Sequence, residues 1–119
     1  MNTDLSQAFD KLRKAAEGLP LVGESTSHGT PALKIRGKLL CRVRDAETAM
    51  VSCPPEEQEM LLEAAPDLYS ETEYHIGWPA ILVHLDLIPF DELHLRLEQA
   101  WLRQAPKPLA RTWRARHTL

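Results

Sequence analysis

The sequence contains few cysteines and lacks the short motifs that give such residues a function. Cys41 and Cys53 are the two cysteines among 119 residues, too few for a disulfide-stabilised secreted domain. Their spacing is not the CxxC pair of zinc or redox sites, and no G-x-S-x-G nucleophile elbow occurs. We therefore expect reduced thiols, no cofactor, no bound metal and no enzymatic activity.

Long hydrophobic runs are also missing. No apolar stretch approaches the roughly 20 residues that a helix needs to cross a bilayer. The first residues do not combine a basic region with an apolar run, as a signal peptide would. The sequence therefore predicts a cytoplasmic, monomeric protein without a membrane partner, and its length predicts one domain.

Acidic residues are absent from two segments. The net charge is −3, which does not favour a general polyanion binder. Residues 46–99 nevertheless contain twelve acidic residues and one basic residue, whereas 32–44 and 101–119 each contain five basic residues and no acidic one. The chain is thus a mildly acidic body with two basic segments, which could also be ordinary solvated surface.

Hydrophobic periodicity predicts an α+β fold, an antiparallel sheet with three helices packed on one face. The second helix should turn Met60, Leu61 and Ala64 inward, and the third should bury Leu93 and Leu97. A single domain is expected over residues 1–108, followed by a basic tail, 109–119, that is disordered or loosely docked. The predicted helices are 3–17, 55–65 and 90–104, and the predicted strands are 21–27, the two strands of a hairpin over 32–44, 48–53, 68–72 and 80–87.

The basic segment 32–44 predicts a tight β-hairpin. A three-residue turn, Arg36 to Lys38, would pair Ile35 with Leu39 and Leu33 with Cys41 and so place the apolar residues on one face. Gly37 would then adopt a positive φ. This register directs a second set of side chains outward: Lys34, Leu40, Arg42 and Arg44.

Several motifs together resemble the MmcQ/YjbR family of small bacterial proteins. They are Leu19-Pro20, the segment 24–32 (ESTSHGTPA), the segment 34–39 (KIRGKL), Gly77-Trp78-Pro79, Ala100-Trp101 and Ala105-Pro106-Lys107. The resemblance implies a fold similar to the frataxin-like (CyaY-like) sandwich. It also implies DNA binding by a double-wing arrangement, although the family's biochemical role is generally unassigned.

The leading functional hypothesis is DNA binding through the basic hairpin. Two-stranded ribbons fit the major groove, and Lys and Arg side chains neutralise phosphates. Hydroxyl groups can add hydrogen bonds to phosphate oxygens. The alternative for these charges is an exposed hairpin that blunts a sheet edge. The candidate nucleic-acid-binding residues are Lys34, Arg36, Lys38, Arg42, Arg44, Thr30 and Lys107.

A second hypothesis is a module that binds a small molecule or a protein. Its pocket would be formed by the loops at 28–31 and 74–79, with His28, His75, Trp78 and Trp101 as lining residues. A third hypothesis joins the two histidines to Glu24 or Glu73 as metal ligands, but their spacing matches no known metal motif.

Overall fold

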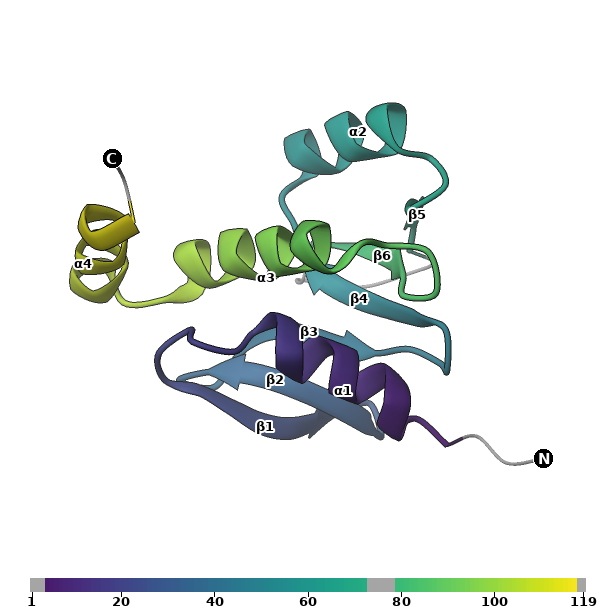
Figure 1. The fold of residues 1–119 in the computed structure, drawn as a ribbon. Helices are drawn as coiled ribbons and strands as arrows, with labels where there is room; N and C mark the ends of the chain where they lie inside the picture. The colour runs from purple at the N-terminus through teal and green to yellow at the C-terminus, as the bar shows by residue number, and fades with distance from the viewer. Residues whose placement is uncertain (1–3, 73–78, 118–119) are drawn as a thin grey trace.

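The computed structural model describes residues 4–72 and 79–117, which form one antiparallel sheet with helices packed against it (Figure 1). The α+β class predicted from the sequence is confirmed. In spatial order the strands are β1-β2-β3-β4-β6-β5, and every neighbouring pair is antiparallel. The strands are β1 (Val22–Ser27), β2 (Thr30–Ile35), β3 (Lys38–Val43), β4 (Thr48–Ser52), β5 (Tyr69–Glu71) and β6 (Ala80–His84).

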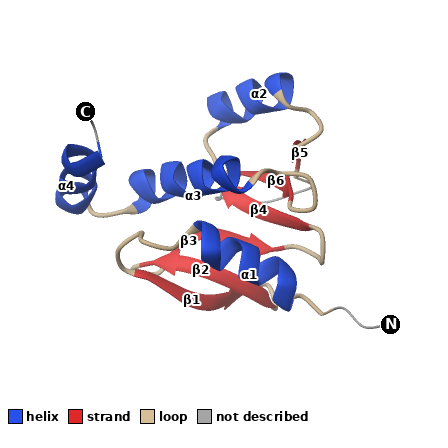
Figure 2. Ribbon diagram, viewed as in Figure 1, coloured by secondary structure: helices blue, strands red, loops and turns tan. Residues whose placement is uncertain are grey.

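Four helices occur in the described residues, one more than predicted (Figure 2). Three of them contact the sheet: α1 (Ser6–Ala15), α2 (Pro55–Ala64) and α3 (Phe90–Gln104). The fourth, α4 (Lys107–His117), occupies most of the segment that was predicted to be disordered or loosely docked. The expected disorder is contradicted, since this segment is helical, with Ala110 buried and Trp113 packed against Trp101 of α3.

The hydrophobic core lies between one face of the sheet and helices α1 and α3. Leu33, Ile35 and Val43 project from the strands into this layer, and Trp101 and Leu97 meet them from α3. The buried stripe predicted for α3 is confirmed, since Leu93, Leu97, Ala100 and Trp101 are all buried. Pro89 precedes the first turn of α3, and Asp91 and Glu92 lie where carboxylates favour the helix dipole.

The turn between β2 and β3 differs from the three-residue turn that was predicted. Only Arg36 and Gly37 form it, with φ angles of 49° and 82°, so Ile35 pairs with Lys38. Two positive φ angles are typical of the type I′ turn, whose twist matches that of the strands. A bulge next to Leu33 then restores the predicted pairing of Leu33 with Cys41. Leu40, predicted to point outward, is consequently buried.

Helix α2 is attached to the rest of the fold mainly through polar groups. No residue of this helix is fully buried, and Met60, predicted to point inward, is 66% exposed. Leu61 and Leu62 pack partly against the core. None of the described helices is long and apolar enough to cross a membrane.

Candidate nucleic-acid interface

Three of the five hairpin cations lie close to the β2–β3 turn and have no partner among the described residues. Arg36 and Lys38 are exposed, and Lys34 is half-buried on β2. Within the described part of the chain, these three side chains make no hydrogen bond or ion pair. Their charges are therefore available to an external anion.

The other two hairpin cations have partners within the protein. The Arg42 guanidinium donates to the hydroxyl oxygen of Thr30 at 3.1 Å and to the carbonyl oxygen of Val43 at 3.3 Å. Thr30 in turn donates its hydroxyl to the carbonyl oxygen of Ser27 at 3.0 Å. Arg44 pairs with Asp45 at 3.2 Å. Arg42 and Thr30 therefore link β3 to the first hairpin, and their polar atoms are partly occupied.

Lys107 begins α4 and lies near the same end of the molecule as the β2–β3 turn. The indole N–H of Trp101 donates to the carbonyl oxygen of Pro20 at 2.9 Å, just before β1. Val22 of β1 pairs with Ile35, the last residue before the turn. The C-terminal end of α3 and the helix that follows it therefore lie toward the turn end of the sheet (Figure 1).

Of the predicted ligand-pocket residues, the structure describes His28 and Trp101, and it does not bring these two together. His28 is exposed in the β1–β2 turn, at the end of β2 opposite to the Arg36–Gly37 turn, and its Nδ1 lies 3.2 Å from the Ser27 hydroxyl. Trp101 is fully buried, so its ring is a core group that lines no ligand surface. His75 and Trp78 lie outside the described residues.

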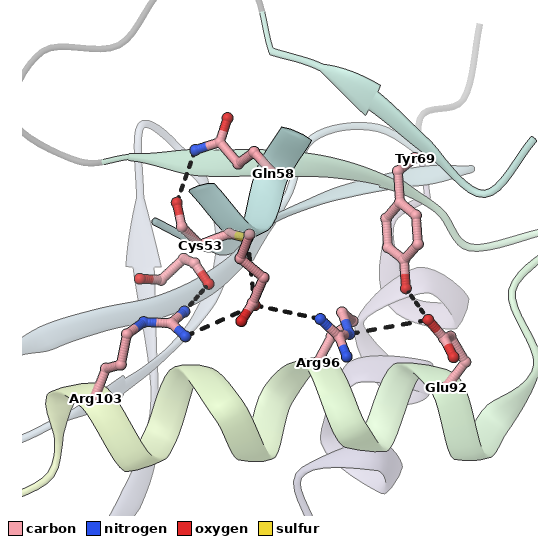
Figure 3. A network of polar contacts seen from close by, with 8 residues as sticks. Cys53, Gln58, Tyr69, Glu92, Arg96 and Arg103 are labelled. Carbon is pink, nitrogen blue, oxygen red and sulfur yellow. Dashed lines mark hydrogen bonds and ion pairs between the residues drawn. The ribbon is translucent and has the colours of Figure 1, made fainter. Parts of the chain in front are cut away.

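A polar network connects α2, α3 and strands β4 and β5 (Figure 3). The Glu57 carboxylate accepts a hydrogen bond from Arg96 at 3.2 Å and lies 3.7 Å from Arg103. On the other side of Arg96, Glu92 accepts a hydrogen bond from the Tyr69 hydroxyl and lies 3.9 Å from the Arg96 Nε. Within this network, Nε of Arg96 is buried without a hydrogen-bond partner among the described residues. The network holds α2 in place.

Both thiols are buried and resist ionisation. Burial raises the pKa of Cys41 to about 12. Burial, with the negative charge of Glu57 and a hydrogen bond to it, raises the pKa of Cys53 to about 12. Thiols with such pKa values stay protonated near neutral pH and are weak nucleophiles. Burial and the hydrogen bond to Glu92 also raise the pKa of Tyr69.

No group of three or more His, Cys, Asp or Glu residues placed to hold a metal ion occurs within residues 4–72 and 79–117. The predicted histidine pair cannot be assembled from this part of the chain, because His75 and Glu73 fall outside it.

The sequence model of the family described as YjbR matches residues 17–103. The chain belongs to the YjbR family. This assignment confirms the resemblance carried by the motifs between Leu19 and Trp101. The matched segment spans the whole sheet, helix α2 and most of helix α3. It includes the β2–β3 turn and its cations.

Relatives of this YjbR-family protein have been identified in mycobacteria. Uncharacterized protein Mb2600 of Mycobacterium bovis and Uncharacterized protein Rv2570 of Mycobacterium tuberculosis are each 30% identical over 123 residues, covering 90% of this chain and 95% of theirs. The crystal structure of Deinococcus radiodurans protein DR2400, with domain DUF419, superposes with a TM-score of 0.68 at 21% identity, covering 91% of this chain and 86% of that one. This likeness establishes the fold.

Three further basic residues lie near the turn end, beside the predicted Lys107. Arg103, Arg111 and Arg114 line a groove together with the predicted Lys107. Arg111 and Arg114 follow Lys107 at intervals of four and seven residues, the spacing that aligns side chains on one face of a helix. This periodicity is the sequence signal for a basic helical face, which was not predicted because the tail was expected to be disordered or loosely docked. α4 lies beyond the segment that matches the YjbR family model.

Proposed function

We propose that this YjbR-family protein binds DNA weakly, with the free cations beside the β2–β3 turn contacting backbone phosphates. The observation that carries the proposal is that Lys34, Arg36 and Lys38 cluster at one turn without partners in residues 4–72 and 79–117. Unpaired cations on a narrow ribbon can approach phosphates closely and release their counterions. The family resemblance to double-wing DNA-binding proteins supports the same conclusion.

The acidic body limits the expected affinity. The net charge of −3 repels DNA at long range, so a local basic surface has to provide the attraction. Arg42 and Arg44 contribute positive potential, but their internal partners reduce their share of direct contacts. We therefore propose binding without strong sequence specificity, because phosphate contacts carry no base information.

Fluorescence anisotropy with a short labelled DNA duplex at low salt tests this proposal. Lys38→Gln should weaken binding about threefold to tenfold, because one phosphate contact is lost. Lys14→Gln is the matched control, since it removes one exposed lysine that lies on α1, outside the β2–β3 hairpin. Equal affinities for the wild type and both variants, or no binding by the wild type, would refute the proposal.

We further propose a non-enzymatic, monomeric and cytoplasmic protein whose fold is of the frataxin-like (CyaY-like) type. The raised pKa values of both thiols support the absence of a cysteine nucleophile. The antiparallel sheet with helices on one face supports the fold type. Size-exclusion chromatography with light scattering tests the monomer, and a dimeric mass would overturn it.

Small-molecule binding is a second candidate, favoured by an apolar cleft between α1 and the start of α3. Its volume is about 250 Å³, and Leu85, Ile88, Phe90 and Leu93 line it with Lys11 and Lys14. An apolar cleft with a lysine at its edge suits an amphipathic carboxylate. Decanoate should then raise Tm, and Lys14→Gln should reduce that rise. No change in Tm with decanoate would count against this candidate.

A further inference from the structure

A basic groove lies between the C-terminal end of α3 and helix α4. Its volume is about 340 Å³. Four of its seven lining residues are cationic and none is acidic. The lining residues are Leu102, Arg103, Ala105, Lys107, Ala110, Arg111 and Arg114.

The cations come from both walls of the groove. Arg103 extends from the last turn of α3, where it donates to the carbonyl oxygen of Ser52 at 2.6 Å. Lys107, Arg111 and Arg114 extend from one face of α4. These three α4 side chains are exposed and have no hydrogen bond or ion pair within the described residues. The groove therefore combines one guanidinium, held by the Ser52 carbonyl and the Glu57 carboxylate, with three cations that have no partner in the described part of the chain.

The two walls are held in position relative to each other. Trp113 packs over Trp101 with 5.2 Å between ring centroids, and its indole N–H donates to the Glu98 carboxylate at 2.8 Å. Ala110 is buried against the core. Glu98 is the α3 carboxylate nearest in sequence to the groove, and one of its oxygens accepts the hydrogen bond from Trp113. These contacts hold the backbone of α4, which carries three of the cations, in place beside α3, and this reduces the entropy lost when an anion binds.

We propose that this groove is a phosphate-binding site for the DNA backbone. One guanidinium group can donate two parallel hydrogen bonds to two oxygens of a phosphate. Several cations around one groove therefore favour a ligand with more than one phosphate. The groove lies toward the same end of the molecule as the β2–β3 turn, which is the arrangement that contact of both with one backbone requires. This inference deepens the proposed function, but phosphate binding by the groove can be measured without DNA.

Sodium tripolyphosphate is the probe, titrated at constant ionic strength and followed by amide shifts in two-dimensional NMR spectra. We expect shifts concentrated in residues 102–114. Arg111→Gln should weaken tripolyphosphate binding about tenfold, as expected for loss of one charge-assisted contact. Arg116→Gln is the matched control, because it removes the same charge from the same helix outside the groove. Circular dichroism confirms that both variants keep α4.

The same variants are then titrated against the labelled DNA duplex. Weaker binding of both tripolyphosphate and DNA by Arg111→Gln supports the full proposal. A loss confined to tripolyphosphate would overturn the DNA backbone as the source and assign the groove to a free phosphorylated molecule. Tripolyphosphate affinity that is unchanged in Arg111→Gln, or equally reduced in Arg116→Gln, would overturn the site. If instead the proposed DNA contact at the β2–β3 turn is wrong, Lys38→Gln will bind DNA with the same affinity as the wild type. The two failures can therefore be distinguished.

Discussion

The ring of Trp113 on α4 lies 5.2 Å from the ring of Trp101 on α3, with an angle of 57° between their planes. Tilted aromatic pairs of this kind are favourable beyond the apolar area that they bury. Because Trp101 is fully buried, the contact ties the basic C-terminal segment to the core. The contact holds α4 beside α3, so that Arg111 and Arg114 line one wall of the proposed phosphate-binding groove.

Removing the Trp113 ring should detach α4. Trp113→Ala loses the contact with Trp101 and the hydrogen bond to Glu98, and we expect a cost of about 2 kcal/mol in unfolding free energy. Hydrogen exchange of the backbone amides in α4 should increase strongly, while exchange in the sheet changes little. Trp113→Phe, which keeps a ring but not the hydrogen bond, should give an intermediate result. Unchanged protection of α4 in the alanine variant would contradict the docking role.

The two-residue turn predicts opposite effects at neighbouring positions. Gly37 has a φ of 82°, so Gly37→Ala forces a side chain into a left-handed conformation and should destabilise the protein by about 1 kcal/mol. Arg36 has a φ of 49°, which asparagine tolerates better than arginine, so Arg36→Asn should preserve or slightly raise stability. Urea unfolding measures both. A marked loss of stability in Arg36→Asn would contradict the type I′ geometry.

The Glu57 carboxylate should be needed to hold α2. Glu57→Gln removes the charge that faces Arg96 and Arg103 and leaves the largely buried Arg96 with only the more distant Glu92. We expect a loss of about 2 kcal/mol, discounted from the range for fully buried pairs because Glu57 is partly exposed. Glu56→Gln, at an exposed position of the same helix, should change stability by less than about 0.5 kcal/mol. Equal effects of the two variants in thermal unfolding would show that the network does not anchor α2.

The thiols should be inert in the folded protein. The pKa values of Cys41 and Cys53, both about 12, keep them protonated near pH 8, so Ellman's reagent should react slowly until urea unfolds the chain. Because each pKa is higher in the folded than in the unfolded state, their contribution to stability is complete below about pH 9, the ordinary thiol value, and falls as pH rises toward 12. Rapid reaction of either thiol in the native protein would contradict this environment.

The sequence predicted the elements with strong periodicity and missed those that depend on tertiary contacts. Helix α3 was predicted with its observed bounds because Pro89 and the spacing of Leu93 and Leu97 determine them locally. The hairpin turn was predicted one residue too long, because a bulge beside Leu33 leaves the pairing with Cys41 unchanged. Helical periodicity alone could not show that α2 keeps Met60 exposed, since polar contacts position this helix.

The candidate site was predictable in part for a similar reason. The cations of the hairpin and Lys107 were identified from local charge alone. Charge patterns do not show which cations have internal partners, so Arg42 and Thr30 were grouped with free residues such as Lys38. The groove required the docking of α4 on α3, a long-range contact that the sequence pattern did not indicate.

The salt dependence of DNA binding tests the central claim most directly. For a duplex, log K falls against log salt concentration with a slope of about −0.9 per phosphate contacted. Three free cations at the turn predict a wild-type slope of about −3, which becomes steeper if the groove also binds. Lys38→Gln should reduce the magnitude of the slope by about 1, whereas Lys14→Gln should leave it unchanged. A wild-type slope near zero, or the same slope in Lys38→Gln as in the wild type, would contradict phosphate binding at the turn.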